Sequence, residues 1–161
     1  MIEIEIIKSK KDDLEKLNRT MTEAFKDDIA LYGEAPYGND SIGEILNKID
    51  EDQCFSFIID NEIVGGMYLK KLDEEEYRLK RIWIDKKDQN KGIGTIIITK
   101  IEKMIQGTRK ITLDTPYKSY RNQYFYEKNG FRKVSEIKVK INESSNLDIN
   151  FTLFEYVKEL R

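Results

Sequence analysis

The strongest constraint on the fold is a strand, a long helical segment and a second strand in the middle of the chain. Residues 77–85 and 111–114 have the composition and alternation of strands. Between them, apolar residues recur at helical spacing over 93–106, and Gly107 follows where a helix cap belongs. The segment 95–99 is β-branched throughout, which locally favours a strand, but it lies in a span too long for one. We therefore expect a helix, and a connection of this length requires the flanking strands to run parallel.

The other elements complete an α/β fold. Helical spacing predicts further helices over 14–29, 41–49 and 120–129. Alternation predicts further strands over 2–6, 54–59, 63–72, 137–141 and 149–157. Within 77–85, regular alternation predicts one face that carries Tyr77, Leu79, Arg81 and Trp83. We expect a single domain over 1–161, with a mixed, mostly antiparallel sheet of about seven strands, a parallel central strand–helix–strand crossover and about four flanking helices.

Composition excludes several classes of function. The 161 residues include 28 Lys and Arg and 30 Asp and Glu, so the net charge of −2 gives no general electrostatic reason to bind nucleic acid or an acidic membrane. There is no His and one Cys, which excludes His-dependent catalysis, His-containing metal sites and an internal disulfide. We expect no metal site. No apolar run approaches the roughly 20 residues of a membrane span, so we expect a cytoplasmic protein.

One segment has the character of a phosphate site. Residues 89–94, Q-N-K-G-I-G, follow the strand 77–85 and open the next helix, where backbone N–H groups and the positive end of the helix dipole are exposed. Gly92 and Gly94 lack a Cβ that would keep a ligand from the main chain. The segment therefore predicts a site for a phosphate or diphosphate. It is neither a P-loop nor a dinucleotide fingerprint, and the simpler interpretation is a tight turn with ordinary helix-start glycines.

Two motifs resemble those of the GNAT superfamily of N-acetyltransferases. Q-N-K-G-I-G is similar to the family signature Gln/Arg-x-x-Gly-x-Gly/Ala, whose turn binds the diphosphate of acyl-coenzyme A. The segment 122–131, N-Q-Y-F-Y-E-K-N-G-F, resembles the second family signature, and the order of elements agrees along the whole chain. The resemblance implies transfer of an acetyl group from acetyl-CoA to an amine of a small molecule, peptide or protein, by direct attack in a ternary complex. A non-catalytic acyl-CoA-binding regulatory module is the alternative.

The resemblance also implies which residues contact the cosubstrate. Residues 82–84 match the strand whose backbone binds the pantetheine arm, and residues 89–95 match the diphosphate turn. Ser119 stands where the family often has Asn, so Asn122 is the candidate contact on the second motif. The implied cosubstrate-binding residues are Ile82, Trp83, Ile84, Gln89, Asn90, Lys91, Gly92, Ile93, Gly94, Thr95 and Asn122. The indole of Trp83 is also compatible with a place in the core.

Tyr126 matches the family tyrosine that protonates the departing thiolate, although it is equally one of three successive aromatic residues. Lys80 and Arg81 occupy positions where the family often has Glu, so Asp114 and Glu34 are the substitute candidates for the base. Tyr32 and Glu34 begin a loop over 32–39 in which we expect acceptor selectivity, and acidic residues there would favour a cationic amine. Exposed strand edges near the C-terminus are compatible with a homodimer.

Overall fold

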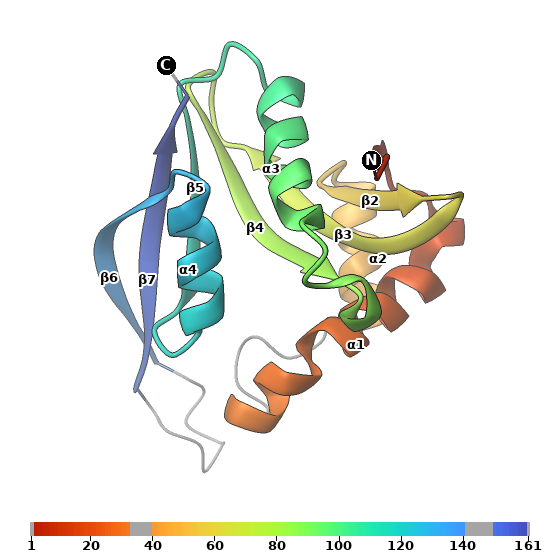
Figure 1. Ribbon diagram of the computed structural model, residues 1–161, viewed down its shortest axis with the longest axis horizontal. Coiled ribbons are helices and arrows are strands. Elements are labelled where there is room, and N and C mark those ends of the chain that lie inside the picture. Colours follow the sequence, from red (N-terminus) through yellow and green to blue (C-terminus); the bar gives the residue numbers. More distant parts are fainter. Residues whose placement is uncertain (1, 33–39, 141–149, 161) are drawn as a thin grey trace.

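The computed structural model describes residues 2–32, 40–140 and 150–160, with side chains throughout except at 28–32, 140, 150 and 151. The helices are α1 (Leu14–Tyr32), α2 (Ile42–Asp50), α3 (Ile93–Met104) and α4 (Tyr120–Lys128) (Figure 1). Short 3-10 turns precede α1 and α3, namely η1 (Lys11–Asp13) and η2 (Lys86–Asp88). The strands are β1 (Glu5–Lys8), β2 (Cys54–Ile59), β3 (Glu62–Lys71), β4 (Glu76–Ile84), β5 (Lys110–Pro116), β6 (Arg132–Lys140) and β7 (Asn150–Glu159).

The strands form one seven-stranded sheet in the order β1-β2-β3-β4-β5-β7-β6. β4 and β5 run parallel and are connected through α3, while the other neighbouring pairs are antiparallel. The predicted mixed sheet with a parallel central crossover is therefore confirmed. The β2–β3 hairpin turns at Asp60 and Asn61, whose positive φ angles of 50° and 65° match a type I′ turn.

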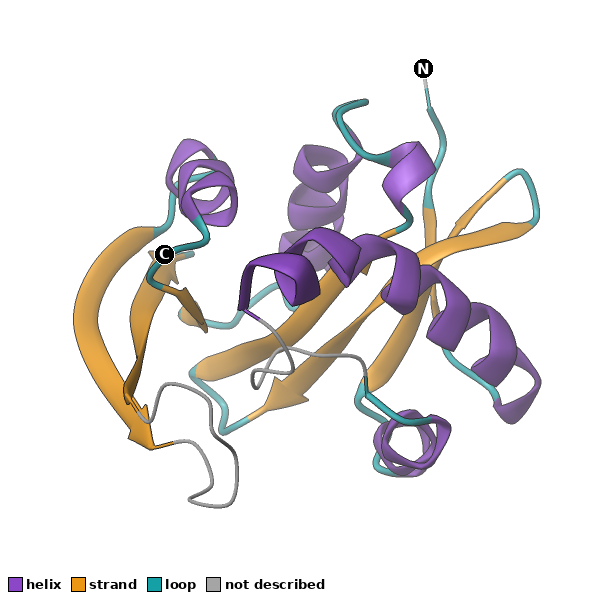
Figure 2. Ribbon diagram, turned by 90° about the horizontal axis from the view of Figure 1, so that it is seen from below, coloured by secondary structure: helices purple, strands orange, loops and turns teal. Residues whose placement is uncertain are grey.

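Helices cover both faces of the sheet and give two separate cores (Figure 2). The first, called the α3 core, includes Ile97 and Ile101 of α3 and Tyr126 of α4. The second, called the α1 core, includes Leu17 of α1 and Ile45 of α2. The β-branched isoleucines of α3 are buried in the α3 core, so packing overrides their local preference for a strand.

A β-bulge in β4 makes the regular alternation expected there wrong. Tyr68 of β3 pairs with Arg81, and the next residue, Leu69, pairs with Leu79, which leaves Lys80 as the extra residue. Because one extra residue inverts the side chains that follow it, Leu79 packs in the α3 core and Trp83 in the α1 core. One strand thus contributes to both cores.

β4 separates from β5 soon after both begin. Their register contains only the pairs Glu76↔Lys110, Tyr77↔Ile111 and Arg78↔Thr112. Beyond Arg78 the two strands diverge, as Figure 1 shows. Residues 79–84 therefore have β3 along one edge and, in the part of the chain that the structure describes, no strand along the other. Apart from the Ile84 carbonyl, which accepts from the Gln89 side chain, main-chain donors and acceptors along that edge are available to a ligand.

Candidate active site

The predicted phosphate turn contains a row of amides for which the described part of the chain provides no acceptor. After β4 the chain passes through η2, and Asn90 and Gly92 then have positive φ angles of 64° and 77° before α3 begins at Ile93. Among the described residues, none accepts a hydrogen bond from the N–H groups of residues 90–95. The next amide, that of Ile96, donates to the Gly92 carbonyl at 3.4 Å. None of the described residues caps this helix start with its own atoms, which is the property an anion site requires.

Side chains of the turn hold it in place. The Gln89 amide nitrogen donates to the Ile84 carbonyl at 2.8 Å and fixes the turn to the end of β4. Arg121 of α4 donates to the Asn90 Oδ1 at 2.9 Å. Lys91 lies 3.6 Å from the Asp88 carboxylate. Gln89, Asn90 and Lys91 therefore brace the turn through their side chains, and the amides are what remains for a ligand.

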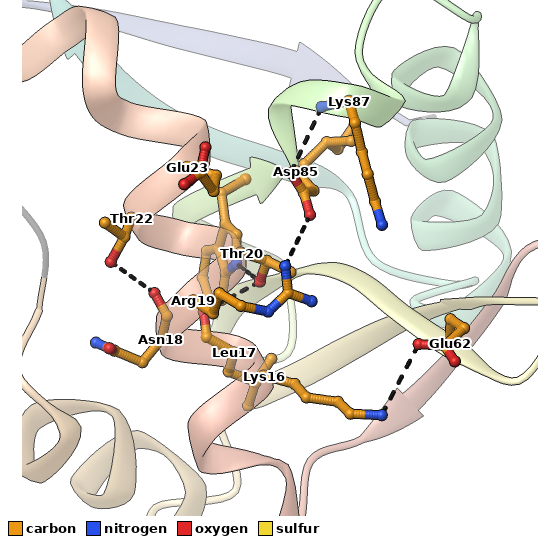
Figure 3. A network of polar contacts seen from close by, with 12 residues as sticks. Lys16, Leu17, Asn18, Arg19, Thr20, Thr22, Glu23, Glu62, Asp85 and Lys87 are labelled. Carbon is orange, nitrogen blue, oxygen red and sulfur yellow. Dashed lines mark hydrogen bonds and ion pairs between the residues drawn. The ribbon is translucent and has the colours of Figure 1, made fainter.

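A buried carboxylate fixes the start of the turn to α1 (Figure 3). Asp85, whose side chain is 4% exposed, accepts from the Arg19 guanidinium at 3.5 Å and from the Lys87 N–H at 3.4 Å. Two residues earlier, the Trp83 indole N–H donates to the Thr20 hydroxyl at 3.0 Å. The Trp83 side chain therefore belongs to the α1 core, and only its backbone is available for the predicted cosubstrate contact.

The two glycines of the turn have different surroundings. A Cβ on Gly92 would meet nothing within 4 Å, whereas a Cβ on Gly94 would lie 2.7 Å and 2.8 Å from two ring carbons of Phe125. Glycine at position 94 is thus accounted for by the packing of α4 against α3. Gly92 keeps the open approach to the backbone that the sequence suggests for both.

The other predicted contacts lie around this turn. Ile82 and Ile84 are half-buried against the α3 core, and Ile93 is buried within it, so that its N–H is the part of Ile93 available to a ligand. Thr95 is exposed in the first turn of α3, and Asn122 is half-buried on α4. The structure thus brings the predicted residues of both motifs to the same side of the sheet.

Tyr126 lies in a cluster of aromatic rings on α4. Its ring centroid is 5.4 Å from that of Phe125, 5.6 Å from that of Phe131 and 6.2 Å from that of Tyr156. Burial, and secondarily the nearby charge of Asp114, raises the pKa of Tyr126 well above that of a free phenol. Its hydroxyl makes no hydrogen bond within the described ranges, so it keeps its proton and has no competing partner there.

Asp114, the predicted base, lies just beyond the paired part of β4 and β5. Its Oδ2 accepts from Arg78 at 2.5 Å, and both side chains are 24% exposed. Arg78 also lies 3.9 Å from Glu155, which pairs with Asp114 across β5 and β7. The Oδ1 of Asp114 has no partner among the side chains that the structure describes.

Several polar and aromatic side chains at the candidate site were not predicted from the sequence. The hydroxyls of Thr115 and Ser119 are buried and have no hydrogen-bond partner within the described ranges. Ser119 has the two-turn spacing from Tyr126 that places both on one face of α4, which is a usable signal. Nothing local to Arg121 or Phe125 indicates their contacts with residues 90 and 94.

Two of the predicted acceptor residues lie outside the part of the structure that is described. Glu34 is in the segment 33–39, and Tyr32 ends α1 with a side chain outside the description. Among the described residues, no helix combines the length and apolar character needed to cross a bilayer. Those residues also contain no group of three or more Cys, Asp or Glu arranged to hold a metal ion.

Comparison with known proteins assigns the family. The sequence model of the acetyltransferase (GNAT) domain matches residues 50–133, which include β4, the turn, α3 and α4. The chain belongs to the GNAT acetyltransferase family. It is therefore an acyltransferase. No curated protein sequence matches it.

Solved structures of N-acetyltransferases share this fold. PaiA from Thermoplasma acidophilum, solved in complex with coenzyme A, has a TM-score of 0.70 at 22% identity, over 98% of this chain and 99% of its own. The ribosomal-protein-S18-alanine N-acetyltransferase of Escherichia coli has a TM-score of 0.74 at 14% identity, over 98% and 94%. Ard1 from Thermoplasma volcanium has a TM-score of 0.74 at 14% identity, over 97% of each chain.

Proposed function

We propose that this GNAT protein is an N-acetyltransferase that uses acetyl-CoA and acts on an amine of a small molecule, peptide or protein. The observation that carries the proposal is the row of uncapped amides at residues 90–95, directly after a strand with an open edge. Oriented N–H groups at a helix start suit a diphosphate. The coenzyme A complex of the PaiA relative supports the same ligand.

The residues present fit a long cosubstrate with a diphosphate at one end of the strand. When bound, acetyl-CoA supplies an acetyl group activated as a thioester. The amides of 90–95 would hold its diphosphate, and the open edge of 79–84 would hydrogen-bond the amide groups of its pantetheine arm. Because alignment of two reactants removes much of the entropic barrier, this positioning is the main contribution that we assign to the protein.

Tyr126 is the proposed general acid. Its raised pKa keeps the proton on Oη at neutral pH, where a thiol of pKa near 8.5 would otherwise leave as a thiolate. Burial among rings fixes the direction of the hydroxyl. Tyr126 would donate this proton to the leaving sulfur.

Asp114 is the proposed group that takes the proton from the acceptor amine. It lies where β4 and β5 separate, and Oδ1 is the oxygen not held by Arg78. Asp114, together with the predicted acceptor residues Tyr32 and Glu34, would favour a cationic amine. A panel of cationic, neutral and anionic amines tests this selectivity, and turnover of anionic acceptors alone would contradict it.

A matched pair of glycine variants tests the turn. Gly92 and Gly107 lie at opposite ends of α3, have φ angles of 77° and 97°, and leave open space around a new Cβ. Alanine at either position costs about 1–2 kcal/mol of backbone strain. We expect Gly92→Ala to weaken coenzyme A binding about tenfold or more in isothermal titration calorimetry, because it blocks the amides. Gly107→Ala should lower the melting temperature without that loss, and equal binding by both variants would exclude the turn as the site.

One observation favours the non-catalytic alternative. Arg81, at a position where the family often has Glu, lies 3.1 Å from Asp40 in an ion pair, and the two side chains are 14% and 15% exposed. This pair engages the Asp40 carboxylate, which is therefore not free to act as a base at that point of β4. Release of free thiol from acetyl-CoA in the presence of mixed amines distinguishes the two functions, since tight binding without turnover is the result expected of a regulatory module.

A further inference from the structure

Arg78 of β4 lies between two carboxylates on the face of the sheet opposite the α3 core. Leu113 of β5 and Tyr156 of β7 pack in that core. Because successive residues of a strand point to opposite faces, Asp114 and Glu155 lie on the other face, directly opposite each other across β5 and β7. Like charges in this position repel, so the guanidinium between them supplies the compensating charge.

The guanidinium has contacts with three strands. Its Nη2 donates to Oδ2 of Asp114 at 2.5 Å and lies 3.9 Å from Oε1 of Glu155. Its Nη1 donates to the Thr112 hydroxyl of β5 at 3.4 Å. The second oxygen of Glu155 accepts from the Ser135 hydroxyl of β6 at 2.6 Å. The direction of the Arg78 side chain is therefore set by β5 and β7 directly, and by β6 through Glu155.

Arg78 lies where β4 and β5 begin to separate. Its pair with Thr112 is the last in the register of the two strands, and Asp114 lies two residues further along β5. Tyr126, the proposed acid, packs in the α3 core and so lies on the other face from Asp114. A thioester held in the gap would have a proton donor on one face and a proton acceptor on the other.

The position of Asp114 matters because a general base must come within hydrogen-bond reach of the proton that it takes. The contact of Arg78 with Oδ2 fixes the orientation of the carboxylate, and with it the place of Oδ1. A displacement of about 1 Å in such a group can cost about 100-fold in rate. The planar guanidinium suits this task, because its N–H donors reach several acceptors at once and the single ammonium of lysine does not.

We infer that Arg78 is a positioning residue for the proposed base Asp114, and that Glu155 and Ser135 hold the guanidinium in the required orientation. The inference rests on the proposed function and extends it from the two reacting side chains to contacts from β6 and β7. An ion pair that only joins the strands is the competing explanation. The test must therefore separate an effect on catalysis from an effect on stability.

A double-mutant cycle in kcat makes this separation. The acceptor is the amine of the panel above that the wild type acetylates fastest, and thiol release gives kcat and the KM for acetyl-CoA. Arg78→Ala should lower kcat about tenfold or more and leave that KM within about twofold. In the Asp114→Asn background the same change should lower kcat no further, because Arg78 acts through Asp114. Arg78→Lys is the second variant, for use where alanine melts below the assay temperature.

Two further measurements concern the guanidinium itself. Millimolar guanidinium chloride should raise kcat of Arg78→Ala and should have no such effect on Asp114→Asn. Glu155→Gln, which removes one charge from the pair, should lower kcat in the same direction as Arg78→Ala. The matched control is Glu76→Gln, since Glu76 accepts from the Thr112 hydroxyl at 2.9 Å and lies 3.5 Å from the Lys110 ammonium. This variant should keep kcat within about twofold of the wild type.

Several results would overturn the inference. If Arg78→Ala keeps the wild-type kcat, or if its loss multiplies with that of Asp114→Asn, Arg78 does not act through Asp114. If Glu76→Gln loses as much kcat as Arg78→Ala, the ion pairs serve the sheet and not the base. Full activity of Asp114→Asn removes the proposed base and this inference with it, but leaves acetyl transfer standing. A wild type that acetylates no amine of the panel removes the proposed function itself.

Discussion

Replacing Gly94 with alanine separates packing from ligand access at the second glycine of the turn. The new Cβ would lie 2.7 Å and 2.8 Å from two ring carbons of Phe125, where ordinary contacts are about 3.4–4 Å. The ring must therefore move by about 1 Å, and overpacking of this kind costs about 1–3 kcal/mol. For a domain of this size, each kcal/mol lowers the melting temperature by about 2–4 °C.

A second substitution makes the reasoning refutable. Phe125→Leu removes the ring that the new methyl group meets, so Gly94→Ala should cost less in the Phe125→Leu background than in the wild type. Calorimetric melting of the four proteins of this cycle gives the coupling energy, and titration with coenzyme A gives the affinities. A cost for Gly94→Ala that does not depend on residue 125 would refute the packing argument. If stability is rescued and affinity is not, Gly94 also serves ligand access.

Three further predictions concern single side chains. Tyr126→Phe should lower kcat by about 100-fold or more and leave the affinity for acetyl-CoA unchanged in titration calorimetry, so equal losses in both would count against a proton donor. Because the raised pKa of Tyr126 exceeds its unfolded value near 10, its contribution to stability is complete below pH 10 and is lost as pH rises above that value. The difference in absorbance at 295 nm between the wild type and Tyr126→Phe should show Tyr126 ionising only on unfolding. Burial raises the pKa of the Cys54 thiol to about 11, so a disulfide reagent should label it only after denaturation, and fast labelling of the native protein would disprove this burial.

Much of the fold was predictable because its signals are local and repeated. The isoleucines of α3 recur at helical spacing over several turns, which outweighs the strand preference of each residue. The parallel pairing of β4 and β5 follows from the length of that helix alone. The position of the turn that we propose as the diphosphate site was predictable for the same reason, since Gly92 follows a strand and opens a helix.

The bulge at Lys80 and the contacts of α4 were not predictable. A bulge adds one residue to one strand and depends on the partner strand, so an alternating sequence gives no sign of it. The packing of Phe125 on Gly94 joins residues of different helices, and no local pattern contains it. The wrong prediction for the side chains of β4 and the unpredicted contact of Arg121 therefore have one cause. Both features depend on contacts between residues that are distant in the sequence.

The bulge also determines which sequence changes β4 can accept. Lys80 is exposed, so its side chain can be exchanged at little cost. Removing the residue altogether would restore unbroken alternation, turning Trp83 away from α1 and sending Ile82 and Ile84 toward it. Position 80 therefore tolerates substitution but not deletion. The fold requires one residue between Leu79 and Arg81, whatever its identity.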